Sequence, residues 1–308
     1  MFQRALVVTP FYAPNIGGAE TFAEDLAKAL AKNYVVHICT IRWKKPVLWE
    51  GTDCRKALSI AIRIAWSLIL MTRKYVYTKI YALGFISCFV CAVLNIPFYA
   101  VVLSIYDFKK KNRIISWVLN KAIRVYIEKS KEAVEDLTKA GVNEAKIVGF
   151  VEWCDQSRFY PKNRPTDKAL KVLFIGRPIK IKGKHIIEAC EKLTKGVNYV
   201  YVEAVPYDSL PSYYQMADVV VIPSLYRENF SRVVVEAASC GCVVITSNLG
   251  ALPEAVKDFG FSIEPTPQKF RELIERLDRD RQLLKILQDK SVIHSLRYFS
   301  KRNTEVFQ

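Results

Sequence analysis

The sequence has no long apolar run and little acidic charge, and both shortages limit what the chain can be. The most apolar stretch, 57–71, is interrupted by Arg63 and is shorter than the ~20 residues that a membrane-spanning helix needs. The amino-terminal MFQRALVVTP is too short an apolar run for a signal peptide, so we expect a cytoplasmic protein. Asp and Glu number 30 against 46 Lys and Arg, which gives a net charge of +16. This balance favours anionic partners such as lipid headgroups, phosphorylated ligands or nucleic acid.

Metal-binding patterns are also scarce. The 8 cysteines are scattered, most of them in apolar runs, which is typical of free buried thiols in a reducing cytosol. Cys88 and Cys91 have zinc-like spacing, but no convincing second pair accompanies them, so we predict no metal site there. Asp278 and Asp280 lie in a highly charged helical segment, 268–288, and fit a solvated helix face. No recognition-helix or aromatic RNA-binding pattern appears, so nucleic acid is not an expected partner.

Apolar strands alternate with amphipathic helices along the chain, which predicts parallel sheets covered by helices on both faces. With 51% hydrophobic residues, the 308 residues suffice for two domains of ordinary size. A polar, proline-containing segment at 161–168 places the boundary near Arg158, and the expected domains are therefore 1–157 and 158–308. The expected strands lie at 4–9, 35–41, 79–82, 98–103, 123–127, 171–175, 198–203, 219–222 and 243–245.

The stretch 217–254 carries the most informative pattern. A buried strand is followed by a polar loop with Glu228, and then by a helix that Ser231 could cap and Gly241 could end. Glu228 is therefore expected at the carboxyl end of a strand, where open parallel sheets bind ligands. Glu236 falls within the helix among Val and Ala, where a buried carboxylate needs a partner. The residues alone leave a binding role and a helix-surface position equally open for Glu236.

Two strand-to-helix connections could bind an anion. Gly17 and Gly18 precede a helix expected at about 21–32, and glycine backbone at a helix N-terminus can approach a phosphate closely. An ordinary turn is the commoner explanation of such a pair. Arg177 and Lys182 follow the strand at 171–175, where both could reach a phosphate. Ordinary surface basicity is the alternative for these two cations.

The frame around Glu228 and Glu236 resembles the retaining glycosyltransferases of the GT-B fold, family 4 (group 1). The two glutamates have seven residues between them, as in that family. The surrounding matches are Ala217-Asp218, Pro223-Ser224, Glu236-Ala237, Gly241, Val243-Val244, Gly250, Pro253-Glu254, and Gly176-Arg177 with Lys182-Gly183. The resemblance implies an α/β chain of two Rossmann-like, doubly wound parallel-sheet domains facing across a cleft. The first domain would lie on the acceptor side and the second would bind a nucleotide sugar, with the last helix able to pack back on the first.

The same resemblance implies the function. A sugar would move from a nucleotide-diphosphate donor to an acceptor hydroxyl on a glycan, glycolipid or protein, with no metal and no cofactor. Arg177 and Lys182 would bind the diphosphate, Glu228 a sugar hydroxyl, and Glu236 the ribose hydroxyls. The remaining donor-binding residues implied are Gly17, Gly18, Asn229, Phe230 and Ser231.

Three departures from the family pattern are visible. Two of them, at Tyr106 and in the shortened second domain, point to an alternative, a catalytically degenerate GT-B scaffold that binds a nucleotide or an anionic membrane. The histidine that often follows the fourth strand is replaced by Tyr106, which precedes Asp107, and tyrosine is a poor general base at neutral pH. Acceptor-side roles for these two residues are therefore weakly supported. Ser231 replaces a glycine, and the strand and turn usual after 198–203 are missing.

The apolar stretch 57–71 and the nearby cations suggest a membrane surface as a further partner. Arg73 and Lys74 follow the stretch, and a basic run occupies 109–113. A core helix with one basic edge and an amphipathic helix lying on a membrane are both consistent with the pattern. We therefore predict peripheral association with the inner face of a membrane as a separate possibility.

Overall fold

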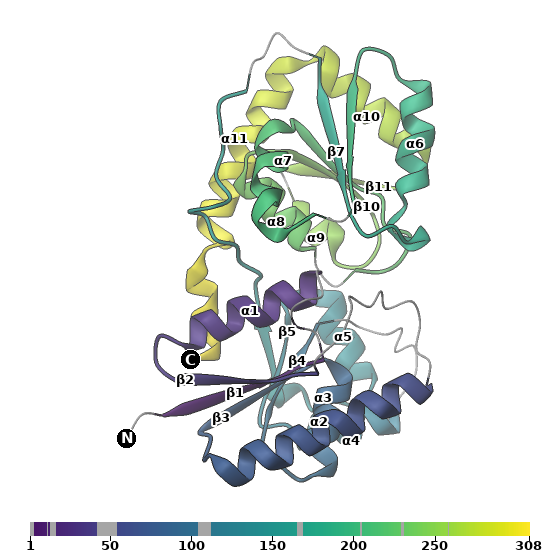
Figure 1. Ribbon diagram of the computed structural model, residues 1–308. Coiled ribbons are helices and arrows are strands. Elements are labelled where there is room, and N and C mark those ends of the chain that lie inside the picture. The colour runs from purple at the N-terminus through teal and green to yellow at the C-terminus, as the bar shows by residue number, and fades with distance from the viewer. Residues whose placement is uncertain are drawn as a thin grey trace. The chain divides into compact units, whose positions relative to one another are not determined.

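Two parallel sheets, one in each of two units of the chain, organise the computed structural model (Figure 1). It describes residues 3–10, 12, 17–41, 54–103, 112–164, 169–203, 205–228, 231–257 and 259–308. The first unit is Met1–Phe150 with Thr304–Gln308, and the second is Val151–Asn303. The division thus falls before the 157/158 boundary that the linker composition suggests. Cys154 explains this difference, because its Sγ lies 2.9 Å from Ser239 Oγ and its N–H donates to Phe299 O, both in the second unit.

The sheet of the first unit has the strand order β2-β1-β3-β4-β5-β6, with every pair parallel. Its strands are β1 (Arg4–Val8), β2 (Val35–Cys39), β3 (Lys79–Leu83), β4 (Tyr99–Val102), β5 (Val125–Glu128) and β6 (Ile147–Phe150). β6 pairs with β5 and is the last strand of this sheet. The chain leaves β1 toward β2 and returns to β3 on the other side. The topological switch point, where ligands bind in open α/β sheets, is therefore at the carboxyl ends of β1 and β3.

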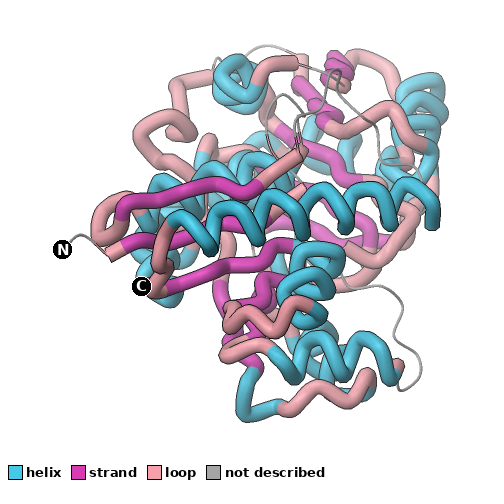
Figure 2. The backbone as a smooth tube through the Cα atoms, turned by 60° about the horizontal axis from the view of Figure 1, so that its bottom comes forward, coloured by secondary structure: helices cyan, strands magenta, loops and turns pink. Residues whose placement is uncertain are grey.

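Helices cover both faces of this sheet. They are α1 (Gly18–Leu30), α2 (Cys54–Lys74), α3 (Gly84–Val93), α4 (Arg113–Lys121) and α5 (Lys131–Lys139), with a 3₁₀ turn η1 (Glu144–Lys146). Buried side chains of α2 to α5 share one core with β1 to β5, and Figure 2 shows the long helix α2 lying over the strands. Phe22 of α1 packs with Phe150 and with Phe307, whose segment 304–308 belongs to this unit.

The sheet of the second unit has the order β11-β10-β9-β7-β8 and is also parallel. Its strands are β7 (Lys171–Ile175), β8 (Asn198–Val202), β9 (Val219–Ile222), β10 (Val243–Ser247) and β11 (Gly260–Ile263). The helices and 3₁₀ turns are η2 (Lys180–Lys182), α6 (Lys184–Leu193), η3 (Tyr207–Ser209), α7 (Leu210–Met216), α8 (Arg232–Ser239), α9 (Leu252–Val256), α10 (Pro267–Arg279), α11 (Arg281–Tyr298) and η4 (Lys301–Phe307), which belongs to the first unit from Thr304 onward. Here the switch point lies between β7 and β9, so the loops that follow these strands meet.

Two local expectations need correction. The helix expected over 268–288 is interrupted at Asp280, because the carboxylate of Asp280 accepts a 2.8 Å hydrogen bond from Leu283 N and starts α11. Ser231 is the N-cap residue of α8, but its side chain makes no capping hydrogen bond. The other end of α8 is as expected, since Gly241 has φ 72° and Cys242 N donates to Ala237 O, which is a Schellman ending.

In the part of the chain that the structure describes, no helix is both long and apolar enough to cross a membrane.

Candidate functional site

Lys182 and Glu228 meet at the switch point of the second unit. Lys182 belongs to the loop after β7, and Glu228 to the loop after β9. Lys182 Nζ lies 2.8 Å from Glu228 Oε1, with the Lys182 side chain 21% exposed and that of Glu228 5% exposed. The same ammonium donates to the hydroxyl of Tyr226 at 2.8 Å, and Ser224 Oγ donates to the Glu228 carboxylate. The predicted cation and carboxylate are therefore in direct contact.

Electrostatics keep Lys182 charged. Burial by itself lowers the pKa of Lys182, but the Glu228 carboxylate and Tyr226 outweigh it, so the pKa lies above its usual 10.5. Burial raises the pKa of Tyr226, Glu228 raises it further, and the charges of Lys182 and Arg177 oppose this rise. At neutral pH, Lys182 is consequently an ammonium and Tyr226 a neutral phenol. The charge of Arg177 acts within the same cluster.

Two glycines allow the backbone to bring these loops together. Gly183 has φ 74°, and a Cβ there would lie 1.9 Å from Pro223 O. Gly250 has φ 63° and its backbone bridges to Glu228, where a Cβ would lie 2.3 Å from the carbonyl oxygen. Ala251 N donates to that same oxygen at 2.8 Å. The position of Glu228 therefore depends on glycine at 250, which the sequence comparison singled out only as part of a frame.

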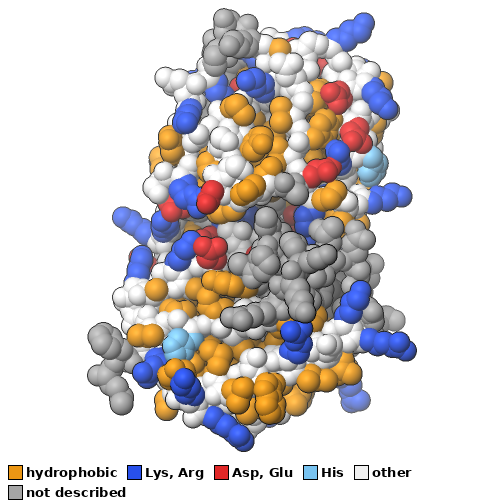
Figure 3. All heavy atoms as spheres, in the orientation of Figure 1, with side chains coloured by type: hydrophobic (Ala, Val, Ile, Leu, Met, Phe, Trp, Pro, Cys, Tyr) orange, Lys and Arg blue, Asp and Glu red, His pale blue; other side chains and the backbone are white. Residues whose placement is uncertain are grey.

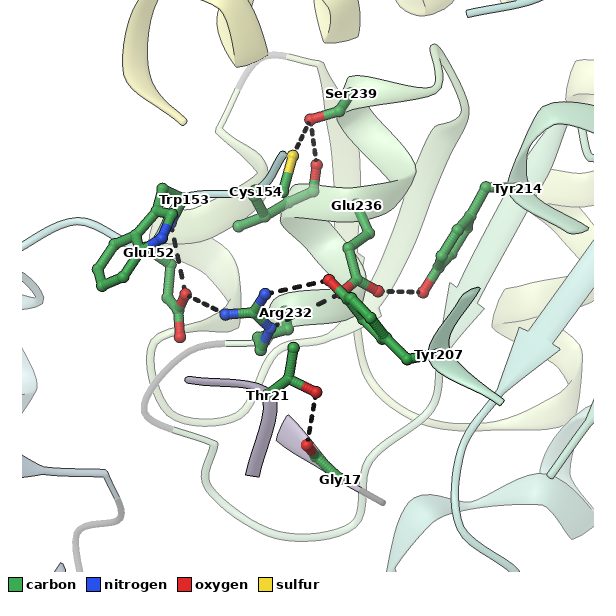
Figure 4. Close-up of polar contacts among 11 residues, drawn as sticks. Gly17, Thr21, Glu152, Trp153, Cys154, Tyr207, Tyr214, Arg232, Glu236 and Ser239 are labelled. Atoms are coloured by element: carbon green, nitrogen blue, oxygen red, sulfur yellow. Dashed lines mark hydrogen bonds and ion pairs between the residues drawn. The ribbon is translucent and has the colours of Figure 1, made fainter. Parts of the chain in front are cut away.

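Glu236 lies in a second buried polar cluster (Figure 4). Tyr214 donates its hydroxyl to Glu236 Oε2 at 2.8 Å, and Tyr207 donates to Oε1 at 3.1 Å. Arg232, one helical turn earlier in α8, has its Nε 3.7 Å from Oε1 and also lies 3.1 Å from the carboxylate of Glu152. Glu236 is only 3% exposed, which excludes the helix-surface alternative. Its charge has the buried partners that the sequence argument required.

The Tyr214 phenol remains a hydrogen-bond donor to Glu236 at neutral pH. Burial raises the pKa of Tyr214 well above its usual value, and the adjacent carboxylate of Glu236 raises it further. The Glu236 carboxylate is therefore held by two phenol donors and the nearby Arg232 guanidinium.

Other predicted site residues belong to the first unit or lie outside the described part of the chain. The contacts of Glu236 described above involve different residues from those of Glu228, although both glutamates belong to the second unit. Gly17 is the N-cap of α1 in the first unit, with its carbonyl accepting from Thr21 Oγ1 at 2.9 Å (Figure 4), and Gly18 is the first residue of that helix. The predicted residues outside the described part of the chain are Tyr106, Asp107, Asn229 and Phe230.

Sequence reasoning missed the polar partners of Glu236, and it missed Tyr226, which shares the Lys182 ammonium with Glu228. One signal was available, because Arg232 precedes Glu236 by four residues, the spacing of a helical ion pair. Tyr207 and Tyr214 carry no such signal, since they reach Glu236 from another helix and turn.

Among the described residues, no group of three or more His, Cys, Asp and Glu could hold a metal ion.

Comparison with known proteins gives a family match to the second unit. The model of the family "Glycosyl transferases group 1" matches residues 155–291, which is less than half of the chain. A D-inositol 3-phosphate glycosyltransferase of Streptomyces bingchenggensis is 37% identical over 94 residues, which cover 30% of this chain and 20% of that protein. O-antigen chain mannosyltransferase B of Escherichia coli is 43% identical over 65 residues, 21% of this chain and 17% of that one. The chain thus matches about a fifth of the length of these curated relatives.

Solved structures match over the whole chain. A sucrose-phosphate synthase from Thermosynechococcus elongatus has a TM-score of 0.83 at 18% identity, with 99% of this chain and 97% of that chain covered. Anabaena Alr3699/HepE in complex with UDP-glucose has a TM-score of 0.74 at 17% identity, with coverage of 99% and 98%. The chain therefore has the GT-B fold, and its residues 155–291 match the family model of group 1 glycosyl transferases.

Proposed function

We propose that the protein is a retaining glycosyltransferase that moves a sugar from a nucleotide-diphosphate sugar to an acceptor hydroxyl without a metal ion. The observation that carries this proposal is the contact between Lys182 and Glu228 at the switch point of the group 1 domain. A cation suited to a diphosphate and a carboxylate suited to a sugar hydroxyl adjoin there. The solved structure of Alr3699/HepE with UDP-glucose shares this fold, which supports a nucleotide sugar as the donor.

The Lys182 ammonium would exchange partners when the donor binds. It would leave Glu228 for the diphosphate, and Glu228 would then accept a hydrogen bond from a sugar hydroxyl. In the transfer step, the bond between the anomeric carbon and the phosphate oxygen breaks, and the acceptor oxygen forms its bond to that carbon on the same face. The leaving phosphate oxygen takes the acceptor proton. Lys182 and Arg177 would stabilise the charge that develops on the diphosphate.

The other residues would orient the donor. Glu236 would accept hydrogen bonds from the ribose hydroxyls, with Tyr207 and Tyr214 orienting its carboxylate. Asn229, Phe230 and Ser231 would present backbone amides, and Gly17 and Gly18 would face the diphosphate. The acceptor hydroxyl would belong to a glycan, a glycolipid or a protein. We also propose a peripheral location on a membrane, because the chain is strongly basic and has exposed apolar side chains on α2, α3 and α4.

A transfer assay tests the proposal. The chain is first screened with nucleotide sugars for a rise in melting temperature, since a bound donor stabilises the folded state by mass action. Stabilising donors are then incubated with acceptors, with and without EDTA, and the anomeric configuration of the product is read by NMR. We expect transfer with retention that EDTA leaves unchanged.

The outcomes separate the enzyme from the degenerate scaffold. Donor binding without transfer to any acceptor would favour a non-catalytic scaffold. Inversion or loss of activity in EDTA would overturn the retaining or the metal-independent part of the proposal. Full activity in both Lys182→Ala and Glu236→Ala would show that the site is wrongly assigned.

A further inference from the structure

Helix α2 is apolar on both of its sides. Ile60, Ile64 and Leu68 are buried in the core of the first unit, so this side behaves as an ordinary core helix. The opposite side carries four further apolar residues at a spacing of four, and all of them are exposed. Their exposed fractions are 63% for Leu58, 60% for Ile62, 67% for Trp66 and 50% for Leu70. A helix that only covers a sheet would place polar residues there.

The two following helices extend this exposed surface. α2 packs against α3, and α3 packs against α4, so the three form one layer over the sheet. Phe89 of α3 and Trp117 of α4 are in ring contact, with centroids 6.5 Å apart, and both are partly exposed. We call the following set the outer apolar face: Leu58, Ile62, Trp66, Leu70, Phe89, Val93, Ile114 and Trp117.

The charged residues of α2 and α4 all have the same sign. No Asp or Glu occurs in residues 54–106, and Asp107 is the only acidic residue in 54–127. The exposed cations of α2 and α4 are Arg55, Lys56, Arg63, Arg73, Lys74, Arg113 and Lys121. Figure 3 shows blue Lys and Arg side chains among orange hydrophobic ones over this part of the first unit, at the bottom of the view. Aromatic and aliphatic groups interspersed with cations suit the boundary between lipid headgroups and acyl chains.

We propose that the outer apolar face is the surface by which the first unit binds an anionic lipid bilayer. It rests on the proposed peripheral location but not on the proposed transfer reaction. A second copy of the chain is a poor occupant, because a symmetric dimer would set these cations against their own copies. On a bilayer, α2 would lie in the interface plane over its ~30 Å length, with Trp66 and Trp117 at headgroup depth. The lysine and arginine heads would meet lipid phosphates.

The test is co-sedimentation of the full chain with vesicles of phosphatidylcholine containing phosphatidylglycerol, against pure phosphatidylcholine. We expect binding to the anionic vesicles that weakens as salt is raised. The apolar variant is Ile62→Gln, Trp66→Gln and Leu70→Gln combined, and we expect at least a roughly tenfold loss of vesicle affinity. The charge variant is Arg63→Gln, Arg73→Gln and Lys74→Gln combined. We expect each lost charge to lower the vesicle affinity about fivefold, which gives roughly a hundredfold for the three together.

Matched controls come from the second unit. Ile286, Ile293 and Leu296 of α11 are exposed by 47%, 50% and 61%, so changing all three to Gln removes a similar apolar area. Lys192→Gln, Lys195→Gln and Lys290→Gln remove three exposed charges elsewhere. We expect both control variants to bind like the wild type. Circular dichroism and melting curves check that every variant is folded.

Each outcome bears on a different claim. If the wild type does not bind anionic vesicles at low salt, both the peripheral location and the surface are wrong, whatever the transfer assay shows. If it binds but the apolar and charge variants bind equally well, the location stands and the surface is wrong. An equal loss in the α11 control would also overturn the assignment.

Discussion

Gly250 lies against the backbone of Glu228, with φ 63° and space for no side chain between the two residues. A Cβ on Gly250 would come within 2.3 Å of Glu228 O and 2.7 Å of Glu228 N. We therefore expect Gly250→Ala to displace the loop that carries Glu228, and both the free energy of unfolding and transfer activity to fall. Left-handed backbone alone costs a non-glycine residue about 1–2 kcal/mol, and the clash adds to this.

Gly196→Ala is the matched control for that variant. Gly196 has φ 76°, and nothing lies within 4 Å of a Cβ built there. It should therefore lose only the backbone term. The difference between the two variants in urea unfolding isolates the contact with Glu228, and we expect it to be about 2 kcal/mol or more. Equal losses in the two variants would show that Gly250 does not fix the position of Glu228.

Lys182→Ala should reduce transfer by removing positive charge from the leaving diphosphate. Loss of one preorganised group of this kind lowers kcat by about 10²–10³-fold. Lys180→Ala is the control, because Lys180 is in the same 3₁₀ turn but its side chain is exposed. Steady-state kinetics with a saturating donor measure the effect. A similar loss in both variants would point to general basicity of the loop rather than to Lys182.

Sequence patterns predicted the parts of this protein that depend on local periodicity. The apolar run at 219–222 is a fully buried strand, and Gly241 ends α8. Both could be predicted because a buried strand consists of apolar residues and a backbone with positive φ favours glycine. The contact of Lys182 with Glu228 could be anticipated only through the family frame, since 46 positions separate the two residues in the sequence. The tyrosines around Glu236 could not be anticipated, because a phenol that reaches across from another element leaves no periodic signal.

Glu236→Gln and Tyr214→Phe should separate ligand binding from structural support. Both variants weaken the buried cluster, and loss of the Tyr214 hydroxyl should cost about 1–3 kcal/mol of stability. If Glu236 binds the ribose, only Glu236→Gln should raise the donor KM, by about tenfold for each 1.4 kcal/mol of lost binding. Unfolding curves and donor titrations on the same preparations give both numbers. An equal KM in the two variants would leave Glu236 with a structural role alone.

The buried thiols should be unreactive in the folded protein. Cys39, Cys91 and Cys154 are free and buried, and burial raises the pKa of each thiol to about 12. The test uses the variant Cys54→Ser, which retains only the seven cysteines found to be free and buried. We expect it to show almost no reaction with Ellman's reagent at pH 8 until denaturant is added. The raised values also mean that the thiols stabilise the fold below about pH 9, and that this contribution is lost as the pH rises toward 12, because the unfolded chain then loses thiol protons first. Rapid labelling of native Cys54→Ser would contradict the burial.

Arg164 should be a large contributor to the stability of the second unit. Its guanidinium donates to carbonyls at the ends of two helices, with Nη1 2.9 Å from Gly241 O, Nη2 2.6 Å from Cys240 O, and Nε 3.1 Å from Gln215 O. Because the helices end here, no N–H group of a following helical turn donates to these carbonyls. The C-terminal end of a helix also attracts a positive charge. Arg164→Met leaves them without this donor, and a cost of about 3 kcal/mol or more in unfolding free energy is expected.

Lys162→Met is the control for Arg164→Met, because Lys162 is an exposed cation two residues earlier in the same segment. It should change the unfolding free energy by no more than about 0.5 kcal/mol. Arg164→Lys should be intermediate, because one ammonium keeps the charge but cannot span all of the carbonyls that the planar guanidinium reaches. Urea unfolding followed by circular dichroism measures all three variants. If Arg164→Met and Lys162→Met are equally stable, the bonds from Arg164 add nothing beyond what water supplies to the same carbonyls.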